Sequence, residues 1–151
     1  MTLVLAKSRE KNIENTRIVC DHIKALAFLF SEGAPLPGRN GRERIIRKLV
    51  RSLLTKLIVM GIASKELLPD LIDIIISIYP ENRELKKSKD KILKIVYDHE
   101  VIYSKTLASA KRRIEEYLKR VSMGKPTEYD RKYFIEHFGI PKELQIFYHY
   151  V

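Results

Sequence analysis

The stretch PLPGRNGRERIIRKLVRSL, residues 35–53, joins a break in the chain to the start of a strongly basic helix. Its two prolines and two glycines interrupt the helical pattern of the preceding residues. Asn40 and Glu43 have the spacing of a capping box, so a helix is predicted to begin there and to run to about Met60–Gly61. At about 100° per residue, one side of this helix is apolar. Its apolar residues are Ile46, Leu49, Val50, Leu53 and Leu57.

The other side of the predicted helix carries cations without an acid. These cations follow one face at i, i+3, i+4 and i+7 and are Arg44, Arg47, Lys48 and Arg51. Arg39 and Arg42 extend the positive charge into the preceding loop, where Gly38 and Gly41 would let the backbone approach a ligand closely. Because arginine offers forked donors that suit phosphate, the face is interpreted as a phosphate-binding surface. An ordinary solvated basic face is the alternative.

The rest of the chain predicts further helices and no strand, because no segment alternates convincingly with period two. The further helical segments are expected over 13–30, as a mostly buried helix from Ser64 to Pro80, over about 88–123, from Thr127 to Gly139, and after Pro141. Gly124 is predicted to close the long segment, which is one helix or two stacked end to end. We expect an all-α fold, an irregular bundle of five to six helices in a single domain over 1–151, with a flexible start over 1–12.

Composition narrows the class of protein. The chain has 151 residues and is 45% apolar, which suffices for a hydrophobic core. Its net charge of +10 and pI of about 9.7 favour a polyanionic partner, although an ordinary lysine-rich surface has the same composition. The most apolar window, residues 67–79, is too short for a membrane span. With no signal-peptide pattern at the start, we expect a cytoplasmic protein that binds no membrane.

No residue pattern indicates catalysis or metal binding. The histidines are dispersed, at His22, His99, His137 and His149. His22 and the single cysteine, Cys20, are both interpreted as core residues. We therefore expect no metal, no cofactor and no catalytic residue. KRRIEEYLKR, residues 111–120, is a second basic cluster, but Glu115 and Glu116 give it the pattern of a surface with paired charges.

Six short motifs occur in a recognisable order. They are DHIKA (21–25), FLFSEG (28–33), PGRNGRERIIRKLVRS (37–52), YPE (79–81), HEVIYSKTLASA (99–110) and EHFGIP (136–141). With these motifs, residues 15–145 resemble the central tRNA-recognition domain of the alanyl-tRNA synthetases, which belong to class II. The resemblance implies a helical domain with tRNA as its partner. The catalytic motifs and the editing metal site of that family are not found, so we do not expect this chain by itself to aminoacylate tRNA.

The resemblance also implies which residues meet the tRNA. Domains of this family read the acceptor stem, especially its G·U wobble pair. The family's reading asparagine corresponds to Arg39, with Asn40 beside it, and the family's reading aspartate corresponds to Glu136. Base-pair reading is thus assigned to Arg39, Asn40 and Glu136, although Asn40 could instead serve only as a helix cap. Phosphate binding is assigned to Arg42, Arg44, Arg47, Lys48 and Arg51.

The leading hypothesis is therefore a tRNA-binding domain, either stand-alone or a piece of a larger synthetase. Alanine tRNA is the expected partner, and a catalytic synthetase subunit is a further candidate. The alternative is a degenerate paralogue that acts as a protein-interaction module. A helix-turn-helix DNA-binding protein is a weaker third interpretation, because the basic helix follows a proline-rich linker rather than a short turn.

Overall fold

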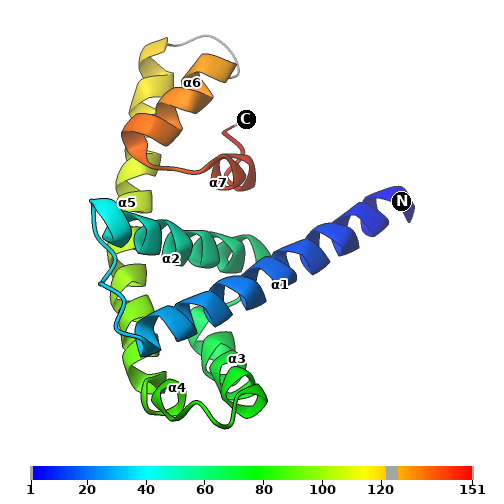
Figure 1. Cartoon of the computed structure of the whole chain (residues 1–151). Coiled ribbons are helices and arrows are strands. Elements are labelled where there is room, and N and C mark those ends of the chain that lie inside the picture. Colours follow the sequence, from blue (N-terminus) through cyan, green and yellow to red (C-terminus); the bar gives the residue numbers. More distant parts are fainter. Residues whose placement is uncertain (1, 122–125, 151) are drawn as a thin grey trace. The chain divides into compact units, whose positions relative to one another are not determined.

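The computed structural model describes residues 2–121 and 126–150, and all of its regular elements are helices (Figure 1). The all-α prediction is confirmed, and the described residues contain no strand. The elements are α1 (Thr2–Ser31), α2 (Gly41–Met60), α3 (Ser64–Ile78), α4 (Arg83–Lys87), α5 (Lys89–Val121), α6 (Glu128–Tyr133), the π-helix η1 (Phe134–Phe138) and α7 (Lys142–Phe147). None of these helices is both long enough and apolar enough to cross a membrane.

The described residues form seven α-helices and one π-helix, more elements than the five to six helices expected. Two short elements account for the difference. The five-residue α4 is too short to show a helical repeat, and it starts where Asn82 Oδ1 accepts a hydrogen bond from the Leu85 backbone N–H at 3.0 Å. The π-helix follows α6 directly. Gly124, the expected end of the long helix, lies outside the described residues.

The chain divides into two compact units, one ending at His99 and one beginning at Glu100, and α5 contributes to both. A single-domain organisation stays a prediction. In the first unit, α1 packs against α2, α3 and α4 (Figure 1). The almost completely buried side chains of this unit include Ile23, Leu26, Phe30, Val50, Leu53, Leu54, Leu68, Ile72, Leu85, Ile92 and Val96. Helix α1 therefore packs against three other helices of the first unit.

Helix α2 buries the predicted face. Ile46, Val50, Leu53 and Leu57 are buried, and Leu49 is half-buried. Gly61 ends the helix with φ +69°, a left-handed conformation that glycine adopts at little cost. Helix α3 is less buried than expected, because Ile74 is 53% and Ile78 63% exposed.

The second unit is built from the part of α5 that follows His99 together with α6, η1 and α7. Its buried apolar side chains are Tyr103, Leu107, Ala110, Ile114, Phe134, Ile140 and Leu144. Thr127, where a helix is predicted to begin, is the N-cap of α6 and forms a full capping box with Asp130. Asp130 also accepts a hydrogen bond from the Tyr117 hydroxyl at 2.7 Å. Gly139, with φ +73°, ends the π-helix at the predicted position.

Replacing Leu53 with Asp should unfold the first unit. Leu53 is fully buried, and a carboxylate there would lie in the core without a partner. We expect the free energy of unfolding to fall by about 3 kcal/mol or more in urea titrations followed by circular dichroism. The matched control is Ile45→Asp on the same helix, because Ile45 is 66% exposed and tolerates a polar side chain. Wild-type stability of Leu53→Asp would contradict this assignment of the core face.

Candidate nucleic-acid interface

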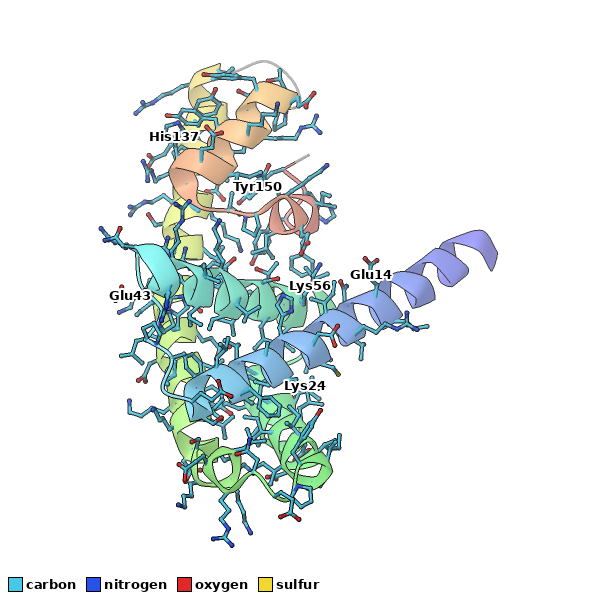
Figure 2. All side chains as sticks on the ribbon, viewed as in Figure 1. Glu14, Lys24, Glu43, Lys56, His137 and Tyr150 are labelled. Carbon is cyan, nitrogen blue, oxygen red and sulfur yellow. The ribbon has the colours of Figure 1, made fainter. Side chains whose placement is uncertain are left out.

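The predicted interface residues are divided between the two units. Those of the first unit lie together in the linker and along α2, and they are Arg39, Asn40, Arg42, Arg44, Arg47, Lys48 and Arg51. Glu43, labelled in Figure 2, marks the end of α2 at which this group begins. Glu136 belongs to the second unit, where it is an exposed residue at the centre of the π-helix.

Four cations at the start of α2 are exposed and unpaired. Within the described parts of the chain, none of their side chains takes part in an ion pair, and they are Arg39, Arg42, Arg44 and Lys48. The stretch from Arg39 to Arg51 holds six basic residues and one acid, Glu43. This end of the helix also carries the positive pole of the helix dipole. The result is a compact positive surface, which we call the α2 basic surface.

Gly38 fixes the linker against the first turn of α2. Its backbone N–H donates a hydrogen bond to the Glu43 carbonyl at 3.0 Å. A side chain at this position would place its Cβ only 2.7 Å from the Cβ of Glu43. The close approach that glycine permits here is therefore to Glu43 of the same chain, and it holds Arg39 and Asn40 beside the helix start.

Asn40 occupies the N-cap position, but the predicted capping box with Glu43 is wrong. Its backbone is extended, with φ −122° and ψ 152°, yet its side chain makes no capping hydrogen bond. Gly41 follows with φ +49°, which departs from ordinary helix geometry at the first turn. The Glu43 side chain meanwhile lies against Gly38. The exposed Asn40 amide, which can both donate and accept hydrogen bonds, is therefore not used to hold the helix.

Arg47 and Arg51 have different surroundings from the exposed cations, because both are half-buried. Arg51 Nε donates a hydrogen bond to Nε2 of His99 on α5, at 3.3 Å. His99 is only 6% exposed, and this burial, helped by the charges of Arg51 and Arg47, lowers its pKa to about 4. The imidazole is thus neutral at pH 7 and accepts the hydrogen bond. Arg51 is therefore held against α5 as well as belonging to the α2 basic surface.

The other residues considered as candidates, His22 and Cys20, have different surroundings. His22 is half-buried rather than in the core as predicted, and its Nε2 lies at hydrogen-bond distance, 3.1 Å, from Ser52 Oγ. Burial lowers its pKa. Cys20 is exposed, so its interpretation as a core residue is wrong. Across residues 2–121 and 126–150, no three histidine, cysteine or acidic side chains gather in a way that could hold a metal ion.

The second basic cluster differs from its prediction. Neither Glu115 nor Glu116 forms an ion pair within the described residues, so the interpretation as a surface of paired charges is wrong. Two of its cations lie over aromatic rings instead. Lys111 Nζ is 3.5 Å from the centroid of the Tyr148 ring, and Arg113 Cζ is 4.5 Å from that of Phe138. Such contacts hold a cation in place without neutralising its charge.

His99 should make stability depend on pH. Its pKa is about 4 in the folded chain against an ordinary value of 6.5, so the unfolded chain binds a proton more readily between these two values. The contribution of His99 to stability is therefore complete above about pH 6.5 and is lost as the pH falls toward 4. We expect His99→Gln, which accepts a hydrogen bond but does not titrate, to lose less stability over this range. Urea unfolding at several pH values measures the difference, and identical pH profiles of the two proteins would contradict it.

Comparison with known proteins places the chain among synthetases. It matches the family described as tRNA synthetases class II (A) over residues 2–146. It is 34% identical over 138 residues to an alanine–tRNA ligase of Elusimicrobium minutum, covering 89% of this chain and 15% of that protein. It is 31% identical over 134 residues to the alanine–tRNA ligase of Enterococcus faecalis, covering 85% of this chain and 15% of that protein. It is 26% identical over 150 residues to the alanine–tRNA ligase of Thermotoga maritima, covering 97% of this chain and 17% of that protein.

Proposed function

Because this chain belongs to the family of class II tRNA synthetases (A), we propose that it is a tRNA-binding domain that docks on the acceptor stem. The relatives are alanine–tRNA ligases, which favours alanine tRNA as the partner. The domain would act either alone or as part of a longer synthetase. Aminoacylation is not proposed for this chain by itself, since it spans 15% of the length of these relatives.

The observation that carries this proposal is the α2 basic surface. Arg39, Arg42, Arg44 and Lys48 are exposed, and no acid within the described residues neutralises them. Arg44 and Lys48 are one helical turn apart, about 6 Å along the axis, so both can reach phosphates of one strand. A solvated helix face usually mixes charges of both signs, whereas the single acid between Arg39 and Arg51, Glu43, forms no ion pair with these four cations. A polyanion is the partner that this charge pattern fits.

Arg47 and Arg51 contribute to the same surface in a second way. Both are half-buried, and both lie close enough to the buried His99 to lower its pKa. Arg51 also donates a hydrogen bond to that imidazole. A guanidinium has five N–H donors, so an arginine can contact a structural partner and a phosphate at the same time. We infer that these two arginines bind phosphate from more fixed positions than the exposed four.

We assign base-pair reading to Arg39, Asn40 and Glu136. The wide, shallow minor groove of A-form RNA displays base edges to a loop that approaches it. In that groove the guanine amino group can donate a hydrogen bond to a carboxylate oxygen or to an amide oxygen. The Asn40 side chain makes no capping bond, and the Glu136 carboxylate is exposed. Their assignment rests on the family resemblance, with Glu136 reaching one methylene further than the aspartate of the family.

Reversing two exposed charges should weaken RNA binding. We expect the double variant Arg44→Glu/Lys48→Glu to bind an acceptor-stem RNA hairpin at least about tenfold more weakly at low salt. The slope of log affinity against log salt should also fall by roughly one for each phosphate that the variant no longer neutralises. Fluorescence anisotropy over a salt series measures both quantities. Both side chains are exposed, so the thermal unfolding curve should barely change.

The matched control is Lys86→Glu/Lys91→Glu. These lysines are also exposed in the first unit, and the variant changes the net charge equally. It should bind RNA almost as tightly as the wild type. Equal weakening in the two double variants would mean that net charge alone attracts the RNA and that the α2 basic surface has no special role.

A protein-interaction module is the second candidate function. Helix α3 supports it, because Ile74 and Ile78 are 53% and 63% exposed on one side of that helix. Exposed apolar side chains at this spacing can form part of a protein contact. A folded wild-type chain that binds no RNA hairpin even at low salt would favour this function over tRNA binding.

A further inference from the structure

The second unit contains a hollow that the proposed function does not use. It has a volume of about 210 Å³ and lies between α5 and the segment formed by α6 and η1. Its lining residues are Arg113, Glu116, Tyr117, Arg120, Tyr133 and Phe138. The lining thus combines three aromatic rings with two arginines and one acid.

The aromatic side of the hollow is a fixed wall. The Tyr117 and Tyr133 rings are stacked with centroids 5.6 Å apart, and Tyr133 meets Phe138 edge to face at 5.4 Å. His137 lies 4.2 Å from the Tyr133 ring, and the Tyr117 hydroxyl donates a hydrogen bond to Asp130. The rings are therefore occupied by one another and by their neighbours. The groups of the hollow that can bind an anion are its arginines.

No acidic partner within the described residues neutralises the two arginines of the hollow. Arg113 lies over the Phe138 ring, a contact that orients the guanidinium without neutralising it. Arg120 is exposed, and within the described residues neither arginine forms an ion pair. They are seven residues apart on α5 and thus lie on the same side of the helix, two turns from each other. Glu116, between them in sequence, is exposed and likewise without an ion pair there.

We propose that this hollow is a second phosphate-binding site, which takes a backbone phosphate of the RNA that the chain binds. A phosphate is small enough for the volume, and forked guanidinium donors match its oxygens. This inference rests on the proposed function, because it takes RNA as the source of the phosphate. The negative charge of Glu116 opposes the binding of an anion. Removing Glu116 should therefore strengthen phosphate binding, whereas removing an arginine of the hollow should weaken it.

The test uses two pairs of variants of the whole chain, measured against the acceptor-stem hairpin over a salt series. Arg120→Glu should lower the affinity roughly tenfold and lower the salt slope by about one. Glu116→Gln should raise the affinity about twofold to fivefold, the range of an exposed charge interaction. The matched controls are Arg112→Glu and Glu115→Gln, which make the same charge changes at exposed positions of α5 that do not line the hollow. We expect each control to change the affinity less than its partner.

The outcomes separate this inference from the proposed function. If Arg44→Glu/Lys48→Glu weakens RNA binding but Arg120→Glu and Glu116→Gln act no differently from their controls, the hollow is not a phosphate site and the proposed function stands. If the wild-type chain binds no RNA, both fail. Binding of inorganic phosphate at Arg113 and Arg120, seen by NMR but without any effect of Arg120→Glu on RNA affinity, would overturn RNA as the source.

Discussion

The burial of the apolar face of α2 against α1 is the interaction on which the candidate interface depends. Ile46, Val50, Leu53 and Leu57 leave water on this face, and each such side chain contributes about 1.5–3 kcal/mol when fully buried. An exposed ion pair contributes about 1 kcal/mol at most. Core burial therefore fixes the rotation of α2 about its own axis. Because the apolar positions face the core, the cations between them lie on the outer side, where Arg44 and Lys48 are exposed.

Packing of the linker against the first turn of α2 also shapes the α2 basic surface. Gly38 allows the chain to fold back onto Glu43, and the hydrogen bond from its N–H to the Glu43 carbonyl holds this turn. The acid that could have neutralised a neighbouring arginine is thereby packed against the linker. Asn40 is left at the helix start with an exposed amide and no capping bond. Local packing thus frees the polar groups that the proposed function requires.

Much of this arrangement could be predicted because it depends on residues close in sequence. The apolar period of α2, the helix start at Thr127 and the helix ends at Gly61 and Gly139 are local features, and the structure has each of them. The predicted capping box between Asn40 and Glu43 is absent, although the two residues have the sequence spacing of a capping box. Spacing does not reveal the positive φ of Gly41 or the competing position of the Glu43 side chain.

The features that could not be predicted join residues far apart in sequence. Arg51 and His99 are 48 positions apart, and nothing in either segment indicates their hydrogen bond. The cluster at 111–120 mixes acids and bases, which is the pattern of a self-neutralising surface. In the structure Lys111 and Arg113 instead lie over Tyr148 and Phe138, which reach α5 only through the fold of the second unit. The hollow beside Arg113 and Arg120 is likewise a product of that packing.

The most direct test of acceptor-stem recognition is a titration of the wild-type chain against two alanine-tRNA acceptor-stem hairpins, one with the G·U wobble pair and one with G·C in its place. Asn40→Ala, titrated in parallel, removes the exposed amide at the start of α2. We expect the wild type to favour the G·U hairpin by about 1–3 kcal/mol, the scale of one altered base pair in a nucleic-acid site, and Asn40→Ala to lose most of this preference. Equal affinity of the wild type for both hairpins would contradict base-pair reading, and absence of binding to either would contradict acceptor-stem recognition altogether.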